Sequence, residues 1–363
     1  MAAVRKLRDE GGRVSWTVVD EHGLPIEPID DFLGYLHAIE RSPNSQRAYA
    51  YDLKAYFAFL GQRGLDYTVV TSEDLAFFVR HLRRPDPDVA LLSATASVRS
   101  AATVNRVMSG VSGFYRYLED RDGLPVAQRL AQRARAAFRT ERGLLDGITG
   151  TAFDRTTIGP RLRPEPRHLE VLTVQQARLI IDNCQSLRDK FFFTLLATTG
   201  MRRGQALGLR HCDVDTRART VTIEPRNDNA NGARAKTPKR AKLPIDRDLA
   251  RLYLDYMHHE YGHLDSDYVF VSLSGPTAGD PLREEAIDAL VRRLRARVGF
   301  SGWSCHTFRH TFATLHHRAG MKIEIISHLL THGSVKTTAD IYSHLDVEDL
   351  RDQLVRHGCW ATS

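Results

Sequence analysis

The sequence contains little cysteine. Four cysteines occur among 363 residues, and no two of them have zinc-ligand spacing or belong to a dense disulfide framework. A small secreted domain held together by disulfides is therefore excluded, and reduced thiols in the cytosol fit the pattern best. The four are Cys184, Cys212, Cys305 and Cys359.

Long apolar segments are also missing. No run of about 18 apolar residues is present, so the sequence predicts no transmembrane helix. The N-terminal stretch MAAVRKLRDEGGR is too polar for the apolar core of a signal peptide. Neither an internal repeat nor a low-complexity segment is found. These absences predict a globular protein of the cytoplasm.

Length and composition favour two soluble domains. A chain of 363 residues is longer than one typical domain. Hydrophobic residues make up 42% and charged residues 26%, which is ordinary for a globular protein. Lys and Arg exceed Asp and Glu by 51 to 44, giving a formal charge of +7. This balance permits an anionic partner such as nucleic acid, although many basic proteins bind none.

Residues 1–128 are predicted to form a short strand or hairpin followed by a helical bundle. Within an N-terminal extension, 1–27, apolar residues at 14, 16 and 18 alternate with polar ones, which is typical of a strand. Residues 28–128 contain four segments with helical periodicity. Asn44 and Ser45 are candidate caps of the second helix, and Thr71-Ser72 precedes the third.

Residues 129–170 interrupt this pattern and are predicted to connect two domains. The part from 129 to 167 carries nine arginines against four acidic residues and ends in three prolines. Two interpretations remain open: a solvated linker, or a basic strap that lies along DNA phosphates.

Residues 171–363 are predicted to form a second, mainly helical domain with a small antiparallel sheet, an α+β arrangement. Thr173 and Gln176 fit a capping box that opens its first helix. A strongly apolar helix covers 191–196, and strands at 221–223 and 243–245 form a hairpin. Further helices are expected at 247–259, 282–297, 306–318 and 323–330.

One motif in this domain suits a phosphodiester. His306 and Arg309 are three residues apart and so share a helix face. Arg offers a bidentate charge-assisted clamp, and His can move a proton. An ordinary surface His and Arg would look the same. Zinc is disfavoured, because His306 and His310 have the right spacing but Thr307 stands where a zincin helix has Glu.

Other candidate residues are less specific when taken singly. Arg202 follows Gly200, a pattern that also fits a helix C-cap with an exposed Arg. Lys236 lies in the loop between the two strands, where a basic residue is usually just solvated. His332 precedes Tyr342 by ten residues, and a lone Tyr near a C-terminus is most often structural.

Taken together and in order, these residues resemble the tyrosine recombinase (phage integrase) family. The resemblance covers the second domain through the segments TGMRRG, HTFRHTFAT and LLTHGS…TTADIY. The segment SPNSQRAYAYDLKAYFAFL at 42–60 resembles the helical core-binding domain of the same family. DEHGLPIEPI at 20–29 and NGARAKT at 231–237 resemble the transposase A type encoded by site-specific transposons.

The resemblance implies a site-specific recombinase that cleaves and rejoins DNA through a 3′-phosphotyrosyl intermediate. It also implies a residue for each step of that reaction. Tyr342 would be the nucleophile, His306 its base and Lys236 the acid for the leaving group. Arg202, Arg309 and His332 would hold the phosphate. Neither a cofactor nor a metal is implied. The implied partner is double-stranded DNA. The protein would bind it as a homotetramer in the synaptic complex, and a companion recombinase is a further option.

Two positions depart from the family pattern. The family usually has Glu three residues after the first Arg, where this chain has Gln205. It usually has Gly before the second His, where this chain has Thr331. Neither departure removes a reacting group, but Gln205 supplies no charge to orient Arg202, so reduced activity is one expectation.

Three other functions remain to be compared. A DNA-binding regulator could keep the fold without catalysis, and the two departures leave room for it. A type IB topoisomerase would use the same chemistry but would not need two DNA sites brought together. A metal-dependent nuclease would form no covalent complex.

The tail at 346–357 has Leu350 and Leu354 at helix spacing. It could dock on a neighbouring protomer or pack on its own chain.

Overall fold

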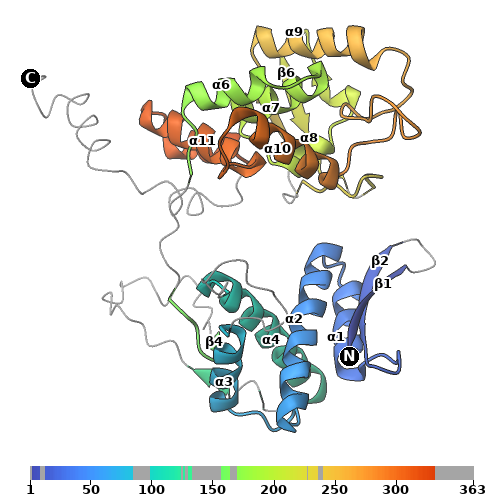
Figure 1. The fold of residues 1–363 in the computed structure, drawn as a ribbon, viewed down its shortest axis with the longest axis vertical. Coiled ribbons are helices and arrows are strands. Elements are labelled where there is room, and N and C mark those ends of the chain that lie inside the picture. Colours follow the sequence, from blue (N-terminus) through green and yellow to red (C-terminus); the bar gives the residue numbers. More distant parts are fainter. Residues whose placement is uncertain are drawn as a thin grey trace, which may run out of the picture. The chain divides into compact units, whose positions relative to one another are not determined.

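The computed structural model divides the chain into two compact units, residues 1–166 and 167–363 (Figure 1). It describes residues 2–8, 13–84, 99–123, 126, 130–132, 157–163, 170–226, 228–235 and 240–331. No helix within these ranges is long and apolar enough to cross a membrane.

Within its described residues, the first unit combines a hairpin with four helices of 11 residues or more. Strand β1 (Ala3–Arg8) pairs antiparallel with β2 (Val14–Val19), with Ala3 opposite Val19 and Arg8 opposite Val14. The hairpin predicted from alternation in 14–18 is therefore confirmed. The helices are α1 (Glu27–Ala38), α2 (Pro43–Arg63), α3 (Ser72–Leu82) and α4 (Ala101–Asp122).

Local capping sets where two of these helices begin. The sequence predicts that a third helix follows Thr71-Ser72, and in the structure Thr71 and Asp74 form a reciprocal capping box at the start of α3. The prediction for α2 was wrong by two residues. Ser42 is its N-cap and accepts a hydrogen bond from the backbone N–H of Ser45 at 3.2 Å. Pro43 fixes this start, because proline is well suited to the first helical position.

The core of the first unit is rich in aromatic residues. Tyr56 and Tyr115 are fully buried, and their hydroxyl oxygens lie 2.7 Å apart. Tyr115 donates onward to the carbonyl of Tyr67, so these buried hydroxyls are paired. Burial raises the pKa of both tyrosines, which keeps them neutral.

Two segments outside the bundle complete this core. In the hairpin, Val18 is fully buried and Thr17 donates to Asp30 at 2.6 Å. In the predicted connection, Ile158 is buried and Leu162 exchanges two hydrogen bonds with the side-chain amide of Asn105 on α4. Residues 157–163 therefore pack against α4. The first two residues of this segment form β4 (Thr157–Ile158), which pairs antiparallel with β3 (Ala131–Gln132).

The second unit is mainly helical and has one small antiparallel sheet. Strands β5 (Val214–Asp215), β6 (Thr220–Ile223) and β7 (Ala241–Pro244) pair in that order. The helices are α6 (Val174–Asp182), α7 (Leu187–Thr199), α8 (Arg203–Leu207), α9 (Arg247–Tyr256), α10 (Glu284–Val298), α11 (Cys305–Arg318) and α12 (Ile323–Leu329). The short helical turns are η1 (His211–Asp213) and η2 (Met257–Tyr261).

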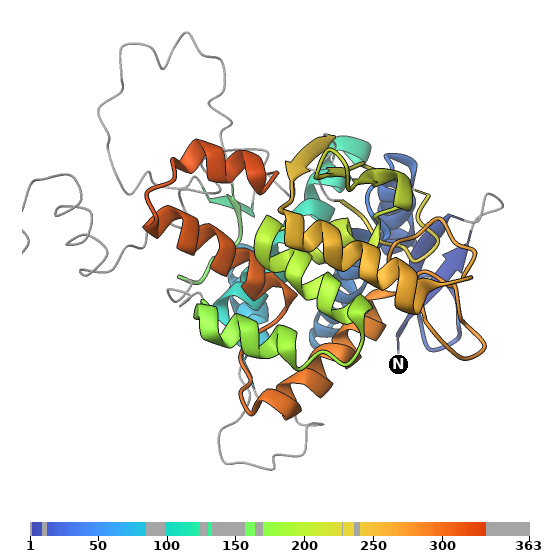
Figure 2. The same ribbon diagram turned by 90° about the horizontal axis from the view of Figure 1, so that it is seen from above.

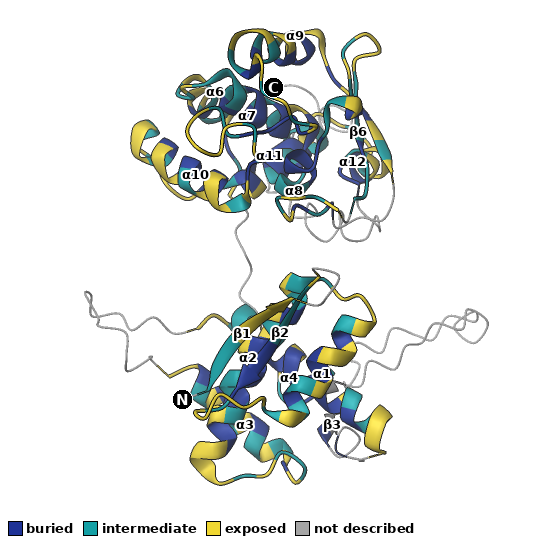
Figure 3. Cartoon of the chain, turned by 90° about the vertical axis from the view of Figure 1, so that its right-hand side faces the viewer, coloured by how far each residue is buried: buried dark blue, intermediate teal, exposed yellow. Residues whose placement is uncertain are grey.

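Helix α7 is the centre of this unit. Phe191, Phe192 and Phe193 follow one another, and all three are buried. A helix that is apolar on every side must be surrounded, and α6, α9 and α11 pack around it (Figure 2). Figure 3 shows the result, with α7 buried while the outer face of α10 is exposed. Helix α7 therefore supplies a rigid base for the residues that follow its C-terminus.

Most of the predicted elements of this unit are confirmed, with two differences. The capping box of Thr173 and Gln176 opens α6. The sheet has a third strand, β5, which is too short to give a periodic signal. The helix predicted over 247–259 ends as α-helix at Tyr256 and continues as the π-helical turn η2.

Candidate active site

A tight turn after α7 positions Arg202. Gly200 ends the helix in the left-handed region with φ +65°, and Met201 is buried. A Cβ on Gly200 would lie 2.7 Å from side-chain atoms of Leu330 and of Phe312 on α11. Glycine is therefore required here both for its backbone angle and for its small size. The turn brings Arg202, at the start of α8, next to the end of α12.

Arg309 fixes this convergence from inside. Its side chain on α11 is 2% exposed. The Nη1 atom donates to the carbonyl of Gly200 at 2.8 Å, and Nη2 donates to the carbonyl of Leu330 at 2.5 Å. One guanidinium thus joins α11 to the ends of α7 and α12. Because the group has a rigid planar fork of donors, it also sets the angle between these segments.

Gln205 and Thr331 connect Arg202 to the end of α12. The Oε1 atom of Gln205 accepts from the backbone N–H of Arg202 at 2.9 Å. Its Nε2 atom donates to Oγ1 of Thr331 at 2.9 Å. The same oxygen accepts from Nη1 of Arg202 at 3.4 Å. Both departures from the family pattern therefore lie at this one contact.

Arg203 is occupied elsewhere. It forms ion pairs of 2.5 Å with Glu284 and with Asp288 on α10. Arg202 and Arg203 are adjacent in TGMRRG, and sequence resemblance alone selects the first of them. In the structure, Arg203 holds α8 against α10, whereas Nη1 of Arg202 donates to Thr331.

His306 lies on the first turn of α11 and is exposed, in contrast to Arg309. The spacing of three residues predicts a shared helix face, yet of the two only Arg309 is buried. The ring of His306 is 4.4 Å from that of His310, nearly perpendicular to it. Burial, together with repulsion from nearby His306 and Arg309, lowers the pKa of His310 to about 4. His310 is therefore neutral at neutral pH.

Lys236, His332 and Tyr342 lie outside the described residues. The segments that lead to Lys236 and His332 are described, and both lie next to α8. Thr331 directly precedes His332. Residues 228–235 lead to Lys236 and pack closely on α8: a Cβ on Gly204 would lie 2.6 Å from the carbonyl oxygen of Arg234. Asn231 donates to the carbonyls of Leu207 and Leu282.

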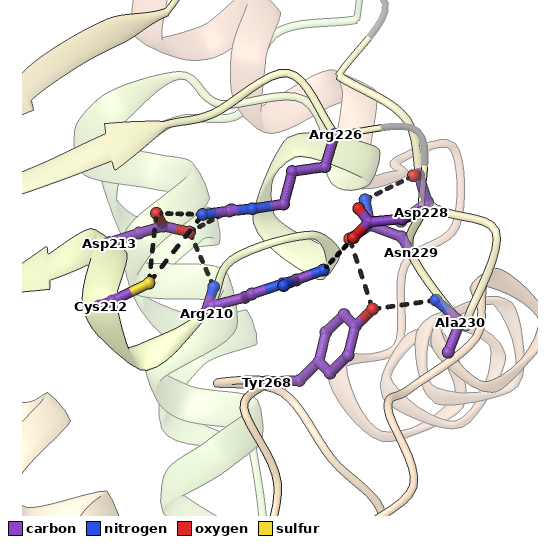
Figure 4. Close-up of polar contacts among 9 residues, drawn as sticks. Arg210, Cys212, Asp213, Arg226, Asp228, Asn229, Ala230 and Tyr268 are labelled. Carbon is purple, nitrogen blue, oxygen red and sulfur yellow. Dashed lines mark hydrogen bonds and ion pairs between the residues drawn. The ribbon is translucent and has the colours of Figure 1, made fainter.

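A polar network holds the beginning of this segment (Figure 4). Arg226 clamps Asp213 through two bonds of 2.6 and 2.8 Å. Arg210 donates to Asp228 at 3.0 Å, and its guanidinium lies 5.5 Å from the ring centre of Tyr268. Sequence reasoning did not identify these residues, because charges 13 or 18 positions apart give no local signal.

The close approach of α8 to residues 233–235 predicts a local effect of Gly204→Ala. The new methyl group would overlap a backbone oxygen, and such overpacking costs about 1–3 kcal/mol. We expect amide hydrogen exchange to rise about tenfold or more in peptides from 203–207 and 228–235. Gly61→Ala is the control, because Gly61 is on α2 and has open space around it. Unchanged exchange in Gly204→Ala would show that the backbones are not in contact.

The lowered pKa of His310 predicts a loss of stability in acid. An unfolded His has a pKa of about 6.5, so the unfolded chain binds a proton that the folded chain refuses between about pH 6.5 and 4. Stability should fall as the pH is lowered through this window. In calorimetry, His310→Gln should show a smaller fall in thermal midpoint than the parent chain. His263→Gln, at an exposed loop position, should follow the parent, and equal slopes for all three would contradict the assignment.

Comparisons with known proteins agree with this geometry. The phage integrase family pattern matches residues 170–349, and the N-terminal SAM-like domain of phage integrases matches residues 29–122. Transposase A from transposon Tn554 of Staphylococcus aureus is 31% identical over 344 residues, covering 94% of each chain. Tyrosine recombinase XerD of Mycobacterium leprae is 30% identical over 332 residues, covering 89% of this chain and 94% of that protein.

A solved structure supports the fold. The Tn1549 transposon integrase, in complex with a circular intermediate DNA, aligns with a TM-score of 0.62 at 14% identity. The alignment covers 91% of this chain and 99% of that one. The predicted combination of a helical core-binding domain with a mainly helical catalytic domain is confirmed. The chain belongs to the phage integrase (tyrosine recombinase) family, and it is a site-specific recombinase that breaks and rejoins DNA without a metal ion.

Proposed function

We propose that the chain mobilises a DNA element, using Tyr342 to cleave one strand at a time. The observation that carries this proposal is the meeting of three motif segments at one point. The ends of α7 and α12 join α11 through the guanidinium of Arg309. This arrangement supports a shared phosphate pocket, since Arg202 follows the first segment and His332 follows the second.

In the proposed first step, the Oη atom of Tyr342 attacks the scissile phosphorus. A bond forms between Oη and phosphorus, and the bond to the 5′-oxygen breaks, leaving a 3′-phosphotyrosyl link and a 5′-hydroxyl. A free Tyr has a pKa near 10, so it needs a base at neutral pH. His306 takes this proton, and its exposure on the first turn of α11 supports access to the DNA.

The two arginines and His332 stabilise the charge that develops on the phosphate oxygens. Hydrogen bonds to charged groups contribute about 1.5–3 kcal/mol each. If two clamps act only in the transition state, they supply roughly 10²–10⁴ in rate. Lys236 then donates a proton to the departing 5′-oxygen. In the reverse step, a 5′-hydroxyl from a second duplex attacks the phosphotyrosyl link, so strands are exchanged without ATP.

The biological role that we propose is transposition of the transposase A type. The similarity to the Tn554 protein extends over 94% of both chains, and the Tn1549 integrase adds a second transposon protein of the same fold. Chromosome resolution is the second candidate, supported by the similar identity to XerD. A recombination assay distinguishes the two roles. Excision between a pair of transposon ends would favour transposition, and recombination at a chromosomal resolution site would favour chromosome resolution.

For the assembly, we propose a homotetramer on paired DNA sites. Residues 28–128 act as the core-binding domain and 171–363 as the catalytic domain, with 129–170 between them along the duplex. The tail from 346 docks on a neighbouring protomer, and a companion recombinase is a further option. Deleting residues 346–363 should then abolish synapsis in a gel-shift assay while single-site binding remains.

The nucleophile is tested on a nicked suicide substrate that carries the cognate site. The unaltered chain should leave a DNA adduct that resists SDS, in EDTA as well as in magnesium. Tyr342→Phe should leave none, because it lacks the attacking oxygen. An adduct with Tyr342→Phe would exclude this nucleophile. Absence of any adduct would instead favour a regulator or, with cleavage dependent on metal, a nuclease, and relaxation of supercoils by a monomer would favour a topoisomerase.

The proposed role of Lys236 is tested by changing the leaving group. Lys236→Ala should slow cleavage by about 10²–10⁴, the usual contribution of general acid catalysis. A substrate with sulfur in place of the bridging 5′-oxygen leaves as a thiolate and needs no proton. It should restore cleavage by Lys236→Ala and have no such effect on Arg202→Ala. Equal rescue of both variants would mean that Lys236 is not the acid.

A further inference from the structure

The two departures from the family pattern touch each other. Gln205 and Thr331 are 126 residues apart in the chain, yet Nε2 of Gln205 lies 2.9 Å from Oγ1 of Thr331. Gln205 is 3% exposed and Thr331 is 8% exposed. The two positions that depart from the family pattern are therefore joined by a buried polar contact.

The donors and acceptors of the pair are complementary. Gln205 uses its oxygen to accept from the backbone of Arg202 and its nitrogen to donate to Thr331. A Glu at 205 could perform the first task, but a carboxylate has no N–H for the second. With Gly at 331, the amide of Gln205 would lose this buried acceptor, and a buried donor without its acceptor is destabilising. Two combinations at positions 205 and 331 are therefore consistent: Glu with Gly, and Gln with Thr.

The backbone at Thr331 indicates that its hydroxyl matters. Thr331 has φ +53°, in the left-handed region where glycine is favoured and a β-branched residue is strained. Gly would relieve this strain, so the backbone gives no reason for Thr. What Thr adds is an oxygen that accepts from both Gln205 and Nη1 of Arg202.

The pair also affects the charge near Arg202. A carboxylate at 205 would partly neutralise the guanidinium. Here, a neutral amide accepts from the backbone N–H of Arg202, and a neutral hydroxyl accepts from Nη1 of its guanidinium. We propose that Gln205 and Thr331 form a coupled pair of positioning residues, which orient Arg202 toward the scissile phosphate without a carboxylate. The proposal rests on the function assigned to Arg202 above.

The test compares Thr331→Gly and Thr331→Val with the parent chain at saturating nicked substrate. Both variants remove the hydroxyl, and Val also keeps the β-branched shape and the strain. Each should slow cleavage about tenfold, corresponding to about 1.4 kcal/mol in the barrier. The Kd for DNA and the thermal midpoint of Thr331→Gly should change little, because relief of backbone strain offsets the lost hydrogen bond. Thr331→Ser, which keeps the hydroxyl, should recover cleavage relative to Thr331→Val.

Coupling is tested by repeating Thr331→Gly in a Gln205→Glu background. In that background, Thr331→Gly should slow cleavage only about twofold or less, because residue 205 then has no amide N–H that needs an acceptor. Thr198→Val is the matched control, since Thr198 is exposed on α7 and its hydroxyl bonds to its own helix. Equal losses from Thr331→Gly in both backgrounds, or parental cleavage by Thr331→Val, would overturn the proposal. If the parent chain forms no adduct, the proposed function fails instead.

Discussion

The buried guanidinium of Arg309 is the interaction on which the geometry of the site depends. The carbonyls of Gly200 and Leu330 accept hydrogen bonds from its N–H groups and so compensate its burial. An uncompensated buried charge is strongly unfavourable, of the order of several kcal/mol, so the two carbonyls cannot move away independently. The ends of α7 and α12 are held together for this reason, and a Lys could not replace the fork of donors that spans them.

The rest of the second unit supports this contact. Helix α7 is surrounded by its neighbours, so the turn at Gly200 starts from a fixed base. From there α8 passes so close to residues 233–235 that only a hydrogen fits on Gly204. The network around Asp213 and Tyr268 restrains the same segment from its other end. Segments that are distant in the chain are thus held in a common frame.

Periodicity and capping residues predicted most helices, because those signals are local. The Thr71 and Thr173 caps are examples, while at α2 the proline after Ser42 outweighed the Asn44 signal. The motifs named Arg202, His306 and Arg309 by type and order, but not the burial of Arg309, which depends on what packs beside α11. The contact of Gln205 with Thr331 was equally hidden, since nothing local links them. The catalytic roles of all six site residues remain predictions, and Lys236, His332 and Tyr342 also lie outside the described residues.

The N-terminal hairpin changes how much chain the first unit needs. The family pattern begins at residue 29, after both strands. Yet Val18 is fully buried, β2 packs on α1 and α2, and Thr17 is bonded to Asp30. Exposing buried valines costs about 1.5–3 kcal/mol each, a large part of the stability of a small domain. A fragment cut at the family boundary would lose part of its interior, so a self-sufficient first unit has to begin before β1.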